Sequence, residues 1–426
     1  MKTAALSHVR STPGDADSGH PLAILLIVVT TLVVIQNRPE PPVASLVAVL
    51  AVLVALAITR SLEKGLIVAV VVQVVFPEAV FGLATYLFGV PSLLYWVRGR
   101  EHSVAVMKRQ PFLFILGLMA VISTLLTAIT SYEADVGVLL RICTLALLAA
   151  VLFFRLHSAS ADHLATSAVF AALGVALVYL AQRGAVLVAS GSNSWAAAAP
   201  LDEWLSRNSL VVLFILGLID RLDRLLSRQQ TLLNFAMCAA FTCAALATFS
   251  RSGYLALALA VLVLLYRHRR RFIFMTLPVL AVAVPWPESV IQRIEYTSSS
   301  GALDPSSAAR VDLWRAAWSI ALDHPVLGVG IHSLSRTFQD YGVLGDFLYA
   351  HNSYLTLAAS LGVVLPVTFL VFACVSLWRR RASISPRTLS LLMACAVASW
   401  FGEPLLAAPV LVLTLVICAP TQNQVV

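Results

Sequence analysis

The sequence has few charged residues. Asp, Glu, Lys and Arg account for 12% of its 426 residues, whereas hydrophobic residues account for 60%. An ordinary soluble domain carries roughly 25% charged residues. Together with a mean hydropathy of +0.89, this shortage excludes an ordinary water-soluble domain and predicts a chain that crosses a lipid bilayer several times.

Paired cysteines and recognisable cofactor motifs are also missing. The six cysteines all lie in apolar stretches, and none forms a Cys-x-x-Cys pair. Disulfide frameworks and thiolate metal sites normally show paired cysteines, so we expect these side chains to fill the core. The sequence has neither a P-loop nor a Gly-x-Gly-x-x-Gly motif, and its acidic residues lack the spacing of a calcium-binding loop. We therefore predict no metal and no nucleotide cofactor.

The charges that are present gather between the apolar stretches. Strongly polar residues within those stretches are almost absent, Gln73 and Glu403 being the exceptions. Ion-coupled transporters usually bury ionisable groups at mid-membrane, so this scarcity argues against an ion pump, although transport of a neutral solute stays open. Basic clusters on one side of the membrane explain the formal net charge of +8, so no nucleic-acid partner is predicted.

The apolar stretches predict the architecture. A bilayer core needs about 20 helical residues, and no segment alternates with a period of two as barrel strands do. We therefore predict an all-α polytopic membrane protein of about 12–14 transmembrane helices with its N-terminus in the cytoplasm. The predicted order is a cytoplasmic tail (1–20), a transmembrane bundle (21–285), a large outer loop (286–350), C-terminal transmembrane helices (351–418) and a tail (419–426).

Two C-terminal stretches have predicted shapes of their own. The stretch 351–378 reads as one long apolar helix. The stretch 388–418 is longer than one span requires, and Gly402-Glu403-Pro404 interrupts it. Because Gly and Pro break helices, this second stretch predicts a hairpin of two short helices.

The large outer loop is a polar island between apolar stretches. Its apolar positions recur at helical spacing, at 311, 314, 317, 318 and 321. Ser306 or Ser307 suits the N-cap of such a helix, and His324-Pro325 suits its end. We predict an amphipathic helix on the membrane surface, with two tryptophans at the interface. A loop of this length is usually functional.

His351 is the candidate catalytic residue of the outer side. It opens an apolar helix, where the positive end of the helix dipole favours the neutral imidazole. A neutral imidazole at the water–lipid boundary can accept a proton from a hydroxyl group. The alternative is that His351 caps the helix together with Asn352 and Ser353.

Arginines on the outer side run against the usual distribution of basic residues. Arg251 lies in the short polar segment that separates two neighbouring apolar stretches, so we expect it at the outer face. Arg183, Arg207 and Arg310 are also expected there. A guanidinium matches phosphate oxygens with two parallel hydrogen bonds, so a lipid phosphate or diphosphate is the natural partner. The alternative for each arginine is contact with ordinary phospholipid headgroups.

Four motifs in this region resemble those of the O-antigen ligase and polymerase superfamily. They are Arg251-Ser252-Gly253-Tyr254-Leu255, Arg310-Val311-Asp312-Leu313-Trp314, His324-Pro325-Val326-Leu327-Gly328-Val329-Gly330, and His351-Asn352-Ser353-Tyr354-Leu355 with Leu361-Gly362-Val363. The resemblance covers about 245–375 and implies a membrane glycosyltransferase of the GT-C type, without metal or nucleotide, in the bacterial inner membrane. Its outer side would then be the periplasm.

The resemblance also implies substrates and site residues. The donor would be an undecaprenyl-diphosphate-linked glycan and the acceptor the terminal sugar of lipid A-core, with membrane lipids around both. His351 would activate the acceptor hydroxyl, and Arg251, with Arg183 or Arg207, would bind the diphosphate. Ser360 and Leu365 depart from the ligase pattern. An O-antigen or exopolysaccharide polymerase or a protein O-oligosaccharyltransferase is therefore an alternative within the superfamily, although the ligase is favoured. In a different class, a lipid or solute transporter also stays open.

Overall fold

The described secondary structure of the chain is α-helical. The computed structural model describes residues 62–75, 158–190, 197–227, 229, 231–268, 305–330, 333–343, 345, 347, 349–379, 381, 384–404 and 407–418. These residues form helices and contain no strand, which confirms the all-α prediction.

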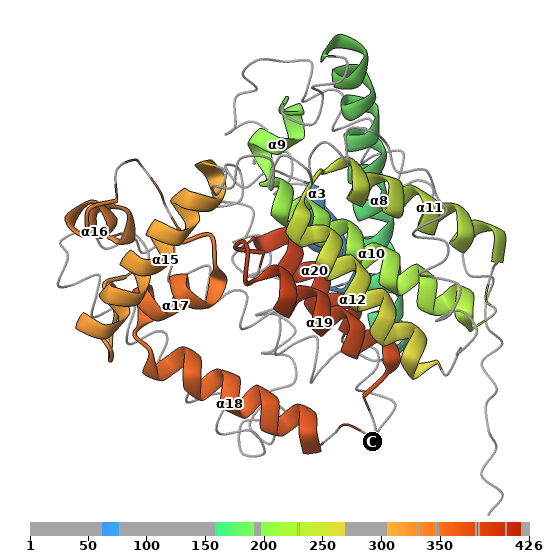
Figure 1. Ribbon diagram of the computed structural model, residues 1–426. Coiled ribbons are helices and arrows are strands. Elements are labelled where there is room, and N and C mark those ends of the chain that lie inside the picture. The colour runs from blue at the N-terminus through green and yellow to red at the C-terminus, as the bar shows by residue number, and fades with distance from the viewer. Residues whose placement is uncertain are drawn as a thin grey trace, which may run out of the picture.

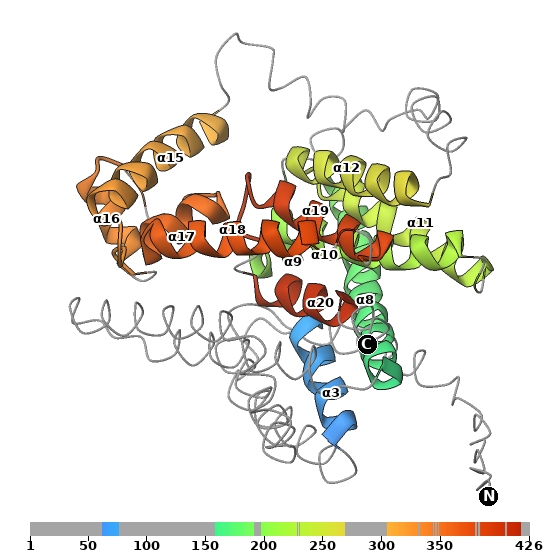
Figure 2. The same cartoon turned by 90° about the horizontal axis from the view of Figure 1, so that it is seen from below.

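A bundle of helices around one apolar core forms the larger part of the described structure (Figure 1). Its members are α3 (Leu62–Val75), α8 (Ser158–Ser190), α9 (Pro200–Trp204), α10 (Arg207–Leu226), α11 (Thr231–Ala247), α12 (Arg251–Arg267), α19 (Pro386–Ala398) and α20 (Ala408–Cys418). In Figure 2, α3 lies beside α8 and α20, with which it is in contact. The core contains Phe214 and Phe241, which are fully buried.

A second group of helices lies beside this bundle in both views. It comprises α15 (Pro305–Asp323), α16 (Leu334–Asp340) and α17 (Ser353–Leu361), which share a small core of their own. Leu313, Ile320 and Phe338 lie in that core and are fully buried. The hydroxyl of Tyr341 donates to Asp323 across this group, and this hydrogen bond to a carboxylate raises the pKa of Tyr341. The helix α18 (Val364–Arg379) follows α17.

The predicted amphipathic helix is α15, with small differences in its start and its buried face. It begins at Pro305, so Ser306 and Ser307 lie in its first turn rather than before it, and it ends at Asp323, before His324-Pro325, as predicted. The buried face centres on Leu313 and Ile320 rather than on 311, 314 and 318. Leu313 and Ile320 face the core that α15 shares with α16 and α17. Trp318 is exposed.

The apolar stretches that the structure describes are helical, but one of them contains a break that the sequence did not predict. The hairpin predicted at 388–418 is present as α19 and α20, with Gly402-Glu403-Pro404 between them. The single helix predicted at 351–378 is wrong, because α17 and α18 are separated at Gly362. Gly362 has φ +80°, and a Cβ there would lie 2.5 Å from the backbone of Val326. The close approach of this turn requires glycine and ends the helix.

Within the described residues, α8 contains one stretch, Ala161–Ala189, that is long and apolar enough to cross a membrane by its length and composition. Several other apolar helices are shorter. The helices α10, α11 and α12 lie where the apolar stretches 209–220, 231–249 and 253–266 predict helices. The remainder of the predicted spans before residue 158, with the cytoplasmic tail, lies outside the described residues.

Candidate functional site

The turn before α17 places His351 in an unusual backbone conformation. Asn352 is the N-cap of α17, and its side-chain oxygen accepts from the backbone N–H groups of Tyr354 and Leu355. The structure therefore assigns the capping role to Asn352. His351 has φ +53°, a left-handed conformation that is uncommon for a residue other than glycine. Such backbone strain clusters at functional sites and persists only where the surrounding structure holds it.

The imidazole of His351 lies against a carboxylate and also reaches the surface. Its Nδ1 is 3.4 Å from Oε2 of Glu403, and 42% of the histidine side chain is exposed. The ring of Phe347 meets the imidazole edge-on, with 6.4 Å between ring centroids. A carboxylate at Nδ1 orients an imidazole and stabilises its protonated form, leaving Nε2 for proton transfer. This geometry suits a general base.

The carboxylate of Glu403 is held by α17. Thr356 on α17 donates its hydroxyl to Oε1 of Glu403 at 3.4 Å and accepts from the backbone N–H of Ala350 at 3.0 Å. The backbone N–H of Ser353 points to the carbonyl groups of Ser399 and Gly402, at 2.8 and 3.0 Å. These bonds fasten the start of α17 to the connection between α19 and α20. The His351–Glu403 pair therefore spans two elements that these hydrogen bonds join.

Arg251 is the first residue of α12, and the local sequence explains how it is held. Ser250 is the N-cap, and its hydroxyl oxygen accepts from the N–H of Gly253. A Cβ at Gly253 would lie 2.4 Å from Val211 on α10, so glycine lets the start of α12 pack directly on α10. The backbone of Phe249, like that of His351, has a left-handed conformation, with φ +52°. The turn before α12 is thus fixed by a cap, a close helix contact and a strained residue.

The guanidinium of Arg251 reaches the second group of helices. Its Nη2 lies 3.4 Å from the hydroxyl of Ser307 on α15. Arg310 is half-buried on α15 and lies one turn after Ser307, on the same side of that helix. The predicted residues Arg251 and Arg310 therefore belong to one region, where α12 meets the start of α15.

Asn208 connects the Arg251 turn to the Glu403 connection. Its side-chain oxygen accepts from the hydroxyl of Ser250 at 2.7 Å, and its amide nitrogen donates to the carbonyl of Phe401 at 3.2 Å. Phe401 precedes Glu403 by two residues. Two hydrogen bonds and two residues of backbone therefore connect the N-cap of α12 to Glu403, beside His351. Neither Asn208 nor the role of Glu403 is predicted by the sequence, although Glu403 is a strongly polar residue in an apolar stretch.

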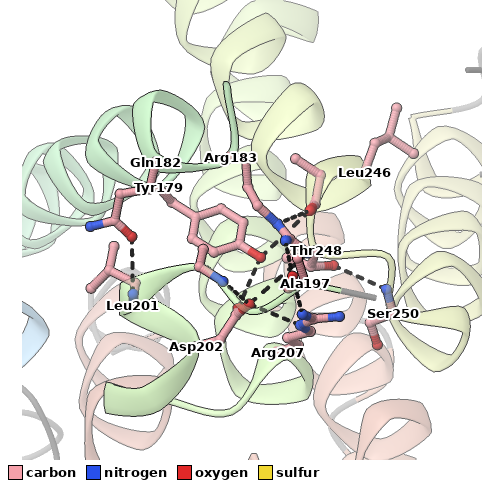
Figure 3. A network of polar contacts seen from close by, with 12 residues as sticks. Tyr179, Gln182, Arg183, Ala197, Leu201, Asp202, Arg207, Leu246, Thr248 and Ser250 are labelled. Atoms are coloured by element: carbon pink, nitrogen blue, oxygen red, sulfur yellow. Dashed lines mark hydrogen bonds and ion pairs between the residues drawn. The ribbon is translucent and has the colours of Figure 1, made fainter. Parts of the chain in front are cut away.

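Arg183 and Arg207 converge on Asp202 (Figure 3). Arg207 donates to the carboxylate of Asp202 at 2.9 Å, and both arginines donate to the carbonyl of Ala197, at 2.6 and 2.7 Å. Tyr179 donates its hydroxyl to the other oxygen of Asp202 at 3.0 Å. Two guanidinium groups thus share one carboxylate, and this network holds α9 and the residues before it.

Arg183 also supports the turn before α12. It donates to the carbonyl of Ala247, at the end of α11, at 2.9 Å, and its guanidinium lies 5.0 Å from the ring centroid of Phe249. Only 5% of its side chain is exposed, whereas Arg207 is partly exposed. Arg183 therefore contacts the segment that positions Arg251, and its own guanidinium is enclosed by protein.

The described residues contain no group of three or more His, Cys, Asp or Glu side chains arranged to hold a metal ion. The site thus contains a histidine–carboxylate pair, which is linked through Asn208 to the turn that bears Arg251. His351 with Glu403 can move a proton, and Arg251 with Ser307 and Arg310 can bind an anion.

A comparison with known protein families finds a match for part of the chain that forms this site. Residues 236–370 match the family model described as O-antigen ligase. This match confirms the resemblance to the O-antigen ligase and polymerase superfamily that the sequence motifs predicted. The matched residues include Arg251, Arg310 and His351, whereas Glu403 lies beyond them. No curated protein matches the chain.

Proposed function

We propose that this chain, whose residues 236–370 match the O-antigen ligase family, is a glycosyltransferase that uses a lipid-diphosphate-linked glycan as its donor. The family comprises glycosyltransferase-like enzymes that are associated with membranes. The observation that carries the proposal is the His351–Glu403 pair, placed by a left-handed backbone and joined through Asn208 to the turn that bears Arg251.

The specific reaction that we propose is the ligation of O-antigen to lipid A-core. The donor is an undecaprenyl-diphosphate-linked glycan, the acceptor is the terminal sugar of lipid A-core, and the site faces the periplasm at the bacterial inner membrane. This placement follows from the predicted topology, in which the residues 286–350 and the start of the following helix lie on the outer side.

His351 acts as the general base in this reaction. Its Nε2 takes the proton of the acceptor hydroxyl as the oxygen attacks the anomeric carbon of the donor sugar. A new glycosidic bond forms, and the bond between that carbon and the diphosphate oxygen breaks. Glu403 at Nδ1 stabilises the imidazolium that results.

Arg251 and Arg310 hold the diphosphate leaving group. The breaking bond leaves negative charge on the diphosphate, and guanidinium groups already in place lower the energy of that charge. Arg207, which is partly exposed, supplies a further guanidinium to the donor. Arg183 acts mainly on the turn before α12, because its guanidinium is enclosed and bonded to Ala247 and Ala197.

The test is glycan transfer by purified protein supplied with the lipid-linked donor and lipid A-core, with products identified by mass spectrometry. We expect His351→Ala to lose transfer by roughly 100-fold or more, as removal of a general base does. His324→Ala is the matched control, because His324 is an exposed histidine near the end of α15, and it should transfer at the wild-type rate.

Other outcomes of the same experiment would overturn parts of the proposal. Normal transfer by His351→Ala would remove the catalytic role of this histidine. Elongation of the donor glycan without attachment to lipid A-core would indicate a polymerase, and attachment to a protein would indicate a protein O-oligosaccharyltransferase. Movement of the lipid-linked glycan across vesicles without covalent change would indicate a transporter.

A further inference from the structure

A second cluster of charged residues lies at the end of the bundle that is remote from His351. Asp220, Arg221 and Arg224 belong to the last turns of α10, whereas Asn208, which contacts the site, belongs to its first turn. At about 1.5 Å per residue, Asp220 lies about 18 Å along the helix from Asn208. Arg387 starts α19, whose other end leads to the Glu403 connection. This cluster therefore takes no part in the site described above.

The three arginines surround a single carboxylate. Arg387 donates from Nη1 to Asp220 at 2.7 Å, and Nε of Arg221 and Nε of Arg224 lie 3.1 and 3.4 Å from the other oxygen of Asp220. Within the part of the chain that the structure describes, Asp220 is the one carboxylate at ion-pair distance from these arginines. The next carboxylate of α10, Asp223, is paired with His268 at 2.8 Å. Among the residues that the structure describes, two positive charges of the cluster are therefore not neutralised.

The cluster is buried, which makes this excess of charge costly. Asp220, Arg221 and Arg387 are buried, and among the described residues neither Nη2 of Arg221 nor Nε of Arg387 has a hydrogen-bond acceptor. Removing an unpaired charge from water costs far more than removing a paired one. A second anion beside the cluster would offset that cost.

Two observations indicate a phosphate group as this anion. Arg224 has 24% of its side chain exposed, so it connects the buried charges to the surface, and guanidinium groups match phosphate oxygens in geometry. Arg221 lies over the ring of Phe170 on α8, 5.6 Å from its centroid, and α8 is the helix of membrane-spanning length. Basic pockets between apolar helices at a membrane surface bind the headgroups of anionic lipids.

We propose that Arg224, supported by Arg221, Arg387 and Asp220, binds the phosphate of an anionic phospholipid at the end of the bundle remote from His351. This lipid would offset part of the buried positive charge and fasten α10 to α19, the two helices that Asp220 and Arg387 join. The proposal does not depend on the glycosyltransferase reaction, because it concerns other residues at the other end of these helices.

The test is native mass spectrometry of the detergent-purified full chain, titrated with dioleoyl phosphatidylglycerol or, as the uncharged comparison, dioleoyl phosphatidylcholine. We expect selective retention of phosphatidylglycerol by the wild type and roughly tenfold weaker retention by Arg224→Gln, the loss of one charge-assisted contact. Arg379→Gln is the control, because Arg379 is an exposed arginine at the end of α18, and it should bind as the wild type does.

Thermal unfolding provides the second arm of the experiment. Phosphatidylglycerol should raise the midpoint of the wild type and raise that of Arg224→Gln much less, whereas inorganic phosphate at equal concentration should raise neither. Equal retention of the two lipids by the wild type, or equal retention of phosphatidylglycerol by wild type and Arg224→Gln, would overturn the proposal. Stabilisation by inorganic phosphate but not by the lipid would overturn the assignment to a phospholipid.

Discussion

At the scale of single residues, the site depends on side chains whose backbone and neighbours fix their direction. His351 and Phe249 both have positive φ, and each lies just before a helix that carries part of the site. Both are larger than glycine, so the local conformation costs free energy that packing and capping must offset. Asn352 and Ser250 supply the caps. A change that relaxes either turn would therefore redirect His351 or Arg251.

Arg251 gives a prediction at this scale. Arg251→Lys keeps the positive charge but loses the planar fork that binds two phosphate oxygens at once. We expect kcat/KM for the lipid-diphosphate donor to fall by roughly 10- to 100-fold, through a higher KM for the donor and a lower kcat, because the guanidinium binds the diphosphate both before and during bond breaking. The KM for the acceptor should change little. Steady-state kinetics of glycan transfer at varied donor concentration measures both constants.

The matched variant for this prediction is Arg315→Lys. Arg315 lies on α15, as Arg310 does, but it is exposed and paired with Asp312 at 3.4 Å. It should leave the kinetics of both substrates unchanged. Wild-type donor kinetics in Arg251→Lys would show that this guanidinium does not bind the diphosphate.

At the scale of helices, close packing sets where each functional side chain begins. The start of α12 lies against α10 because Gly253 has no Cβ to meet Val211. Glycines also act where α17 is separated from α18. Gly362 and Gly328 allow the turn after α17 and the turn after α15 to contact each other. Each glycine allows a backbone approach that no larger residue permits without a shift. The positions of Arg251 and of α17 therefore follow from small residues in their own motifs.

Gly253→Ala tests this packing. The added Cβ would lie 2.4 Å from Val211, so the two helices must move apart. We expect a loss of about 1–3 kcal/mol in the free energy of unfolding, as overpacking of a tight contact gives. Thermal unfolding in detergent detects it as a lower midpoint. A second change, Val211→Ala, should recover part of the loss because it removes the methyl groups that the Cβ meets.

Gly184→Ala is the control for a glycine within a helix. Nothing lies within 4 Å of a Cβ at Gly184 in α8, and alanine has the higher helix propensity. This variant should be as stable as the wild type or slightly more stable. Equal stability of Gly253→Ala and wild type would contradict the packing account of the α12 start.

At the scale of the whole molecule, features that depend on local composition could be predicted from the sequence, whereas features that depend on tertiary contacts could not. The helices α10, α11 and α12 follow from the lengths of apolar stretches, and the α19–α20 hairpin follows from Gly402 and Pro404. The break at Gly362 was missed, because apolar residues continue on both sides of it and its cause is the distant turn at Val326.

The same distinction holds for the site. His351 and Arg251 could be singled out because each is a polar residue at the edge of an apolar stretch. Glu403 lies far along the chain from His351, and no local pattern relates them; only the docking of α17 on the α19–α20 connection brings them to 3.4 Å. Likewise, the sharing of Asp202 by Arg183 and Arg207 comes from the packing of α8 against α9 and α10.

The proposed function depends on His351 and Glu403 acting as one acid–base unit. A double-mutant cycle on the initial rate of glycan transfer tests this most directly, using His351→Ala, Glu403→Gln and the double variant. Residues that act as a unit are strongly non-additive, so the double variant should be no slower than His351→Ala, and the rate of Glu403→Gln alone should fall by roughly 100-fold or more. A wild-type rate in Glu403→Gln, or losses that multiply in the double variant, would contradict it.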